Sequence, residues 1–189
     1  MVRDTDYQDL ELAEASKIHE KQAMAYRKEY LDHGEKSING SGGLIRYESY
    51  DEWLAKISAQ KEIKPSLTDT PATTYFTIRK SDNKIIGSTQ LRHYLTEKLQ
   101  RDGGNVGYGI RPSERGKGYG VKQLALVLEE ARVLNISQVM VHCSKDNRAS
   151  AKVAIRNGGL LVCEGFDEEE GKVSEIYQID LLERADKNV

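Results

Sequence analysis

The spacing of apolar residues divides the chain into a helical N-terminal part and a longer part dominated by strands. Segments 17–33 and 49–61 carry apolar residues at helical spacing, and Ser16 stands where a cap of the first helix is expected. A short, charged strand is expected over 9–13. Between the two helices lies Ile38–Leu44, a glycine-rich segment that we expect to form a flexible loop.

From residue 74 onward, short runs of β-branched and aromatic residues predict strands. The expected strands are 74–78, 84–94, 105–111, 138–143, 159–166 and 172–182. The first two form a hairpin, and so do the last two, joined by an acidic turn. Helices are expected from residue 121 and over 148–157, the latter ended by Gly158, whereas 96–101 fits one helical turn or a long loop.

Length and charge limit the class of protein. The chain has 189 residues, which suits one domain, and its net charge of −2 gives no general attraction to nucleic acid or to anionic membranes. No apolar run approaches the roughly twenty residues that cross a bilayer, and the first residues carry no apolar signal core. We therefore expect a soluble, cytoplasmic protein that acts on neither nucleic acid nor membrane.

The two cysteines, Cys143 and Cys163, both fall in predicted strands. Neither belongs to a Cys-x-x-Cys pair or to a cluster of metal ligands. We expect reduced, buried thiols, and the sequence implies no metal.

The most informative stretch is Gly107–Gly120, which reads GYGIRPSERGKGYG and leads from a predicted strand into a strongly periodic helix. Gly116, Gly118 and Gly120 lack a Cβ, so the backbone can adopt positive φ and approach a bulky anion closely. The first turn of the following helix adds unpaired N–H donors. This combination predicts a site for a diphosphate.

Two common phosphate loops do not fit. A Walker-type loop needs Ser or Thr after its lysine, but Gly118 follows Lys117. The dinucleotide fingerprint needs a different glycine spacing from the one found here.

The pattern Arg115-x-x-Gly118-x-Gly120, after a strand, resembles the coenzyme A loop of the GNAT superfamily of N-acetyltransferases. The resemblance extends from Thr74 to Leu182, and residues 85–120 are similar to a bacterial subgroup. It implies a single-domain α/β GNAT fold, with a mixed, mostly antiparallel sheet flanked by helices. Within residues 1–189, it implies an acceptor side at 1–72, a sheet and acetyl-CoA core at 73–182, and a frayed tail at 183–189.

The resemblance also implies an activity, namely direct transfer of acetyl from acetyl-CoA to a primary amine in a ternary complex. A small-molecule acceptor is slightly favoured over a protein amine, because the N-terminal helices and the glycine-rich segment could close over a small site. The competing interpretations are a coenzyme A-binding regulatory or interaction module without turnover, and an enzyme that uses a longer acyl donor. Many family members dimerise through sheet edges, which leaves a homodimer open.

By resemblance, the cofactor is held by the strand backbone, the glycine loop and an asparagine that opens a later helix. The corresponding residues are Tyr108, Gly109, Ile110, Arg115, Gly116, Lys117, Gly118, Tyr119, Gly120, Val121 and Asn147. Gly109 is expected to let the strand bulge and open a slot for pantetheine. Arg115 and Lys117 are expected to add positive charge, and Asn147 is also a good helix cap.

The proton-transfer groups are less determined. Many relatives carry a tyrosine seven residues after the asparagine, but this chain has Ala154 there. Tyr108, Ser150, Tyr177 or water could replace it, and a thiolate also leaves without a dedicated acid. His142 and His93 are the candidate bases, since histidine titrates near neutral pH. Trp53, Tyr50 and Tyr94 are expected to line the core or the cleft.

Overall fold

The computed structural model describes residues 9–167 and 171–181. The predicted tail at 183–189 and part of the acidic turn lie outside these residues. The strands are β1 (Leu10–Glu14), β2 (Ala72–Arg79), β3 (Lys84–Arg92), β4 (Val106–Ile110), β5 (Gln138–Ser144), β6 (Leu160–Asp167) and β7 (Lys172–Asp180). The helices are α1 (Glu20–Asp32), α2 (Tyr50–Lys61), α3 (Glu97–Asp102), α4 (Tyr119–Val133) and α5 (Arg148–Arg156), with short 3₁₀ turns at Lys17–His19, Leu44–Arg46 and Pro112–Glu114.

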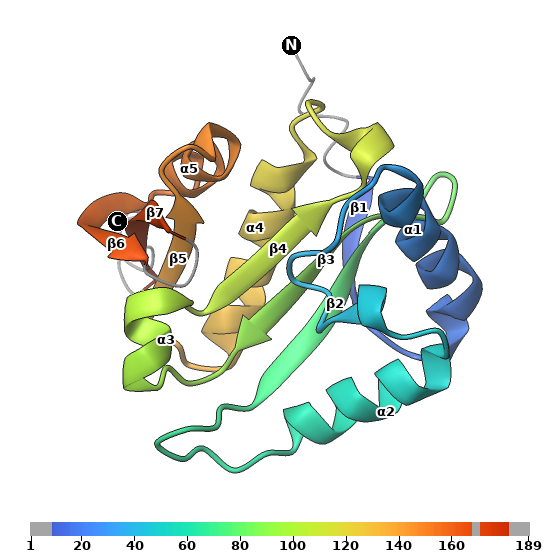
Figure 1. The fold of residues 1–189 in the computed structure, drawn as a ribbon, viewed down its shortest axis with the longest axis horizontal. Helices are drawn as coiled ribbons and strands as arrows, with labels where there is room; N and C mark the ends of the chain where they lie inside the picture. Colours follow the sequence, from blue (N-terminus) through green and yellow to red (C-terminus); the bar gives the residue numbers. More distant parts are fainter. Residues whose placement is uncertain (1–8, 168–170, 182–189) are drawn as a thin grey trace, which may run out of the picture.

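The strands form two antiparallel sheets, ordered β1-β2-β3-β4 and β5-β7-β6. β4 and β5 stand next to each other but separate toward their carboxyl ends (Figure 1). At the start of β4 they are joined by a bridge between Gly104 and Val141 and by hydrogen bonds between Asn105 and Met140. The two sheets are thus connected at one end and open at the other.

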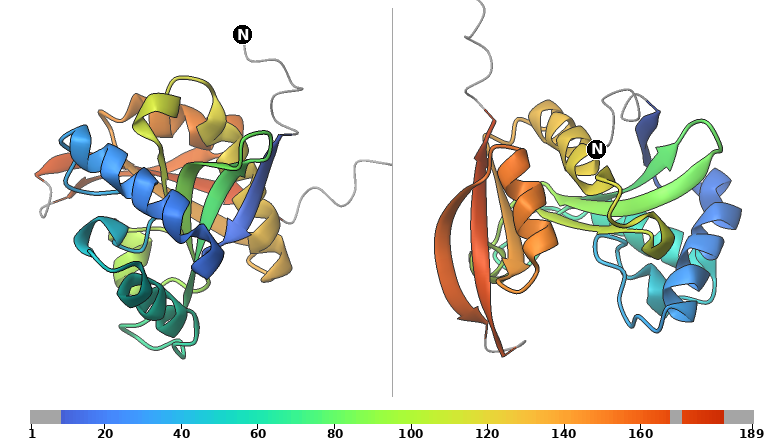
Figure 2. Two further views of the ribbon diagram at one scale, coloured as in Figure 1. Left: turned by 90° about the vertical axis from the view of Figure 1, so that its right-hand side faces the viewer. Right: turned by 90° about the horizontal axis from the view of Figure 1, so that it is seen from above.

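Helices cover both faces of the first sheet (Figures 1 and 2). α4 packs on one face, where Leu124, Val127, Leu128 and Ala131 are buried at helical spacing. α1 and α2 pack on the other face around Trp53, which is fully buried. Because both faces are covered, β2 and β3 are buried along almost their whole length. The expected α/β fold, mostly antiparallel and flanked by helices, is confirmed, but the strands form two sheets and not the single mixed sheet that was expected.

Most predicted elements agree with the structure apart from their ends. The first helix begins as a 3₁₀ turn in which Ser16 N donates to His19 Nδ1 at 3.1 Å, so the α-helix proper starts at Glu20. The undecided segment 96–101 forms α3, capped by Thr96, whose side chain accepts from Leu99 N.

Two expectations were wrong. The glycine-rich segment is packed, since Ile38, Ser41 and Leu44 are all buried. Cys143 is a buried free thiol as expected, but Cys163 is exposed, because it lies on β6 at the edge of its sheet.

Tyr50 and Trp53 are core residues, and Tyr94 is 52% exposed. None of the described helices combines the length and the apolar character that crossing a bilayer requires.

Candidate functional site

The edge of β4 that faces β5 carries backbone groups without a strand partner. Arg92 N donates to Asn105 O at 2.8 Å, and Arg111 N donates to Ile86 O at 2.7 Å. Alternate residues of an antiparallel strand point toward the same neighbour, so residues 105, 107, 109 and 111 face β3. The N–H and C=O groups of Tyr108 and Ile110 therefore point toward the gap between the two sheets.

The glycine loop after β4 presents unpaired N–H donors. Its backbone is left-handed at Gly116 (φ 75°) and at Gly118 (φ 84°), and α4 begins at the next residue without a side-chain cap. Within the described part of the chain, the N–H groups of residues 116–120 donate to no carbonyl and to no side chain. Together with the positive end of a 15-residue helix, they fit a diphosphate.

The two cations of the loop are already paired with carboxylates. Arg115 forms an ion pair with Glu35 at 2.8 Å, and its Nε donates to Ile110 O at 3.0 Å. Lys117 forms an ion pair with Glu114, also at 2.8 Å. Both cations expected to add positive charge are therefore paired with neighbouring carboxylates in this structure.

Glu114 connects the loop to the β2–β3 hairpin. Its side chain is 4% exposed and receives hydrogen bonds from Arg79, Lys84 and Lys117. Burial by itself would raise the pKa of this carboxyl, but the hydrogen bonds from the three cations outweigh it and lower the pKa to about 2. Tyr119 also turns toward this cluster, since its hydroxyl accepts from Arg79 Nη1 at 3.1 Å.

Helix α1 and the glycine-rich segment press against the face of β4 opposite α4. The Tyr30 hydroxyl donates to Ile110 O at 2.7 Å. A Cβ on Gly109 would lie 2.9 Å from Asn39 O, and one on Gly40 would lie 2.2 Å from Gly107 O. β4 keeps an unbroken register against β3 from 106 to 110, so the bulge expected at Gly109 is absent. The glycines of this strand instead permit close contact with another segment.

Tyr108 and Ser150, two candidate catalytic residues, are brought together across the gap. The Tyr108 side chain leaves β4 on the α4 side, and its hydroxyl lies 2.8 Å from Ser150 Oγ on α5. Burial raises the pKa of Tyr108 to about 12. The phenol therefore keeps its proton at neutral pH and can donate a hydrogen bond.

The other residues around α5 have structural partners. Asn147 caps the helix, because its Oδ1 accepts from Ser150 N at 3.1 Å. Ala154 is fully buried in the core. Tyr177 is also buried, and its hydroxyl donates to Glu175 at 2.6 Å, an interaction that raises the pKa of Tyr177 to about 12. Tyr177 is thus engaged away from Tyr108.

The two candidate bases are placed differently. His142 points away from the core side chains Val141 and Cys143 of the same strand, and its Nε2 lies 3.2 Å from Gln100 O. His93 Nε2 lies 2.8 Å from Thr73 Oγ1. Burial, followed by the charge of Lys61, lowers the pKa of His93.

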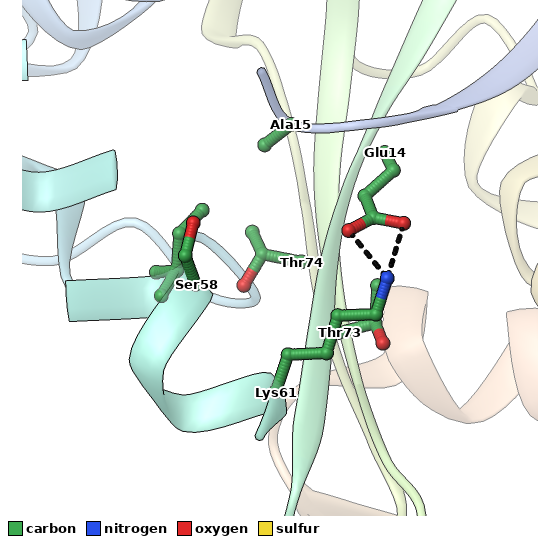
Figure 3. Close-up of a pocket in the computed structure, with 7 residues that line it drawn as sticks. Glu14, Ala15, Ser58, Lys61, Thr73 and Thr74 are labelled. Carbon is green, nitrogen blue, oxygen red and sulfur yellow. Dashed lines mark hydrogen bonds and ion pairs between the residues drawn. The ribbon is translucent and has the colours of Figure 1, made fainter. Parts of the chain in front are cut away.

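A small pocket lies at the other side of the first sheet, between α2 and the β1 and β2 strands (Figure 3). Its lining includes Glu14 and Lys61, which form an ion pair at 2.8 Å. None of the residues predicted to bind cofactor lines it. We therefore place the candidate site at the gap between β4 and β5, not in this pocket.

Among the described residues, no group of three or more potential ligands is arranged to hold a metal ion.

Sequence reasoning missed Tyr30, Glu35, Asn105 and Glu114. Each lies outside the pattern Arg115-x-x-Gly118-x-Gly120, and each makes its contact with the site only because the fold brings the partners together. Glu114 alone had a local signal, since it stands three residues before Lys117 and next to Arg115. The other three carry no signal in the sequence that separates them from ordinary helix or turn residues.

Comparison with known proteins identifies a family. The family model described as "Acetyltransferase (GNAT) domain" matches residues 6–159. No curated protein matches the chain significantly.

Solved structures resemble the chain over nearly its full length. A protein from Salmonella typhimurium, assigned as an acetyltransferase and solved with its cofactor acetyl-CoA, is 17% identical, with a TM-score of 0.62 over 94% of this chain and 96% of its own. The dodecameric spermidine N-acetyltransferase from Vibrio cholerae is 14% identical, with a TM-score of 0.64 over 96% and 99%. The Salmonella typhimurium enzyme that modifies the N-terminal serine of ribosomal protein L7/L12 is 19% identical, with a TM-score of 0.64 over 92% and 95%. At these identities, the likeness establishes the fold.

Proposed function

Because the chain belongs to the GNAT acetyltransferase family, we propose that it transfers acetyl from acetyl-CoA directly to a primary amine, and that the amine is a small molecule. The observation that carries the proposal is the run of unpaired N–H groups at 116–120, placed beside the open edge of β4. Such donors suit the diphosphate, and the backbone of Tyr108 and the N–H of Ile110 suit the amide groups of pantetheine. The Ile110 carbonyl already accepts from Tyr30 and Arg115. Residues 73–182 would form this cofactor core, and residues 1–72 would form the acceptor side.

Loop residues Gly116–Val121 would hold the diphosphate through the backbone, and Asn147 would face the pantetheine arm from α5. Arg115 and Lys117 are assigned to the same site, although each is paired with a carboxylate in the free protein. Gly109 contributes by letting α1 and the glycine-rich segment approach β4. When bound, acetyl-CoA supplies an activated acyl group.

The reaction forms a C–N bond and breaks a C–S bond, while the nitrogen loses a proton and the sulfur gains one. We assign Tyr108, held by Ser150, to the sulfur end, because its protonated phenol can donate to a developing thiolate. We assign His142 to the nitrogen end, where it would act through water from the opposite side of the sheet. His93 is the second candidate base, since its ring is held by Thr73.

A small acceptor is proposed because α1, α2 and the packed glycine-rich segment cover the side of β4 that faces away from α4. A protein amine remains the alternative acceptor.

A homodimer also stays a prediction, for which β6 offers a sheet edge with exposed Leu160, Val162 and Phe166. Light scattering on the purified protein would measure the oligomeric state.

The test combines two measurements on the purified protein. Titration calorimetry with coenzyme A should show binding, and a thiol assay with acetyl-CoA should show release that depends on an added amine. Propionyl-CoA and succinyl-CoA test the choice of acyl donor. Absence of coenzyme A binding would contradict the whole proposal.

The second candidate function is a coenzyme A-binding module without turnover. The buried Ala154 at the position of the usual tyrosine favours it. Binding of coenzyme A without thiol release across the amine panel would select this module.

A further inference from the structure

We propose that Arg115 is a positioning residue, whose contacts with Glu35 and Tyr30 anchor the glycine loop to helix α1 and thereby set the affinity of the loop for coenzyme A. The inference rests on the proposed function, because it concerns the cofactor loop of the same site. It differs from the expectation that Arg115 supplies positive charge to the diphosphate.

The side chain of Arg115 is occupied by three contacts with segments that precede the glycine loop. Its Nη2 donates to Glu35 Oε2 at 2.9 Å and its Nη1 lies 2.8 Å from Glu35 Oε1, so both carboxylate oxygens are engaged. Its Nε donates to Ile110 O at 3.0 Å. The guanidinium carbon also lies 5.3 Å from the centroid of the Tyr30 ring. A carboxylate, a backbone carbonyl and an aromatic face thus hold the guanidinium together.

These contacts place the guanidinium on the side of β4 that α1 covers. Tyr30 belongs to α1, and its hydroxyl donates at 2.7 Å to Ile110 O, the same carbonyl that accepts from Arg115. The N–H donors of residues 116–120 lead instead into α4, which packs on the opposite face of the sheet. The charge of Arg115 is therefore bound on the α1 side, whereas the donors that suit a diphosphate belong to the start of α4.

Helix α1 holds the chain just before Arg115 in the same way. Glu29 Oε2 pairs with Arg111 Nη1 at 2.8 Å, and Glu29 Oε1 accepts from Ser113 N, also at 2.8 Å. Together with the contacts of Arg115 and of Ile110 O, these bonds connect α1 and the turn after it to most of the segment 110–115. This segment leads directly into the glycine loop.

The glycine loop needs an anchor because its own first residue is weakly restrained. Gly116 follows Arg115 directly and adopts φ 75°, and a Cβ there would meet no described atom within 4 Å. A glycine in open space has wide conformational freedom. A fixed residue immediately before Gly116 reduces the entropy that the loop loses when it closes on an anion. Loss of the anchor should therefore weaken binding although no contact with the ligand is removed.

Removal of Glu35 distinguishes anchoring from direct phosphate binding. If Arg115 bound the diphosphate, Glu35 would compete with the ligand for the guanidinium, and loss of Glu35 should tighten coenzyme A binding. If Arg115 anchors the loop, loss of Glu35 should weaken binding, even though it removes a negative charge near an anionic ligand. The two roles thus predict changes of opposite sign in the same variant.

The experiment measures the Kd of coenzyme A by titration calorimetry. We expect Glu35→Ala to raise the Kd about threefold or more and Arg115→Ala about tenfold, because the arginine also loses Tyr30 and Ile110. The double variant should match Arg115→Ala, since both changes break the same ion pair. Arg115→Lys should resemble Arg115→Ala, because a lysine keeps the charge but cannot engage both carboxylate oxygens.

Activity and a matched control separate anchoring from general damage. In the thiol assay, KM for acetyl-CoA should rise in these variants while kcat stays within about twofold. Asp32→Ala is the control, because Asp32 is an exposed carboxylate at the end of the same helix, paired with Lys28, and the Kd should not change. Melting temperatures show that each variant is folded. Glu35→Gln keeps the size of the side chain and should also weaken coenzyme A binding.

Unchanged or tighter coenzyme A binding in Glu35→Ala and Glu35→Gln would overturn the inference and leave the proposed function intact. Additive losses in the double variant would overturn it as well, because Arg115 would then act without Glu35. Failure of the wild-type protein to bind coenzyme A would instead contradict the proposed function and the inference together.

Discussion

Tyr108 links the two sides of the candidate site through one side chain. Its backbone belongs to the open edge of β4, while its hydroxyl reaches Ser150 on α5. The resemblance to the GNAT family implies a phenol on α5, where this chain has the buried Ala154. Under the proposed function, Tyr108 would supply a hydrogen-bond donor to the same gap from β4.

We expect Tyr108→Phe to lower kcat about 10²-fold with little change in coenzyme A affinity, because only the proton donor is lost. The assay is thiol release under saturating substrates. Since burial raises the pKa of Tyr108 to about 12, the wild type and the variant should share the same profile between pH 6 and about pH 10. Tyr94→Phe, at an exposed tyrosine, is the control. An unchanged kcat in Tyr108→Phe would remove Tyr108 from the mechanism.

Asn147 caps α5 and is proposed to bind the pantetheine arm, and one substitution can separate these two roles. Asn147→Ser retains a side-chain oxygen that can accept from Ser150 N, so the cap of α5 should persist and the melting temperature should hardly change. The side-chain amide is lost. If Asn147 binds the pantetheine arm, calorimetry should show coenzyme A affinity falling about tenfold. Unchanged affinity would show that Asn147 only caps the helix.

Glu114→Gln should make the protein less stable in a pH-dependent way. The folded pKa of about 2 lies below the ordinary value of 4.5, so the carboxylate stabilises the fold above that ordinary value, and this contribution is lost as pH falls toward 2. The shift corresponds to about 3 kcal/mol at neutral pH.

Urea unfolding at pH 7 and pH 3 tests this expectation for Glu114. The stability gap between wild type and Glu114→Gln should narrow by about half at the lower pH. Glu129→Gln, at the exposed partner of Arg132, should show little gap at either pH. A gap for Glu114→Gln that does not depend on pH would contradict the pKa of Glu114.

At the level of elements, the glycine-rich segment packs directly against β4. Gly40 has φ 71°, and a Cβ there would lie 2.2 Å from Gly107 O. Gly43 has a similar φ of 86°, but a Cβ there would meet nothing within 4 Å. Alanine substitutions at Gly40 and Gly43 therefore distinguish the cost of a left-handed backbone from the cost of a steric clash with β4.

We expect Gly43→Ala to cost about 1–2 kcal/mol of unfolding free energy, which is the strain of a left-handed backbone. Gly40→Ala should cost at least about 2 kcal/mol more, because the segment must also move away from β4. Denaturant unfolding measures both costs. Equal costs would show that the segment does not press against β4.

The contact between the glycine-rich segment and β4 also shows which elements could be predicted from the sequence and which could not. The strand, loop and helix around Gly107–Gly120 followed from local spacing, and the structure confirms their order. The flexible loop expected over 38–44 failed, because its glycines serve contact with β4 and not freedom of the chain. The buried Gln123 of α4 was equally unpredictable, since its partners Ser88 O and Thr89 Oγ1 belong to β3.

At the scale of the whole molecule, two sheets meet around Asn105, which is 3% exposed. Its N donates to Met140 O at 2.8 Å, its Oδ1 accepts from Met140 N at 2.9 Å, and its Nδ2 donates to Arg92 O at 3.3 Å. These bonds set where β4 and β5 begin to diverge.

We expect Asn105→Ala to lower the free energy of unfolding by about 1–3 kcal/mol, because it leaves the part-buried N–H of Met140 unpaired. Coenzyme A affinity should fall as well, since the width of the gap is no longer fixed. Unfolding in urea and calorimetry measure these effects. A variant with lower stability but unchanged affinity would show that Asn105 does not position the cofactor gap.

The sequence by itself determined the periodicity of the helices and strands, and it located the glycine loop that follows β4. These features depend on neighbouring residues, because backbone conformation and the N–H groups at a helix start are local properties. The tertiary structure decided which side chains meet. Tyr108 contacts Ser150, 42 positions away, and Arg115 pairs with Glu35, 80 positions away. Such pairs arise only when distant segments pack together, and no local pattern encodes the choice of partner.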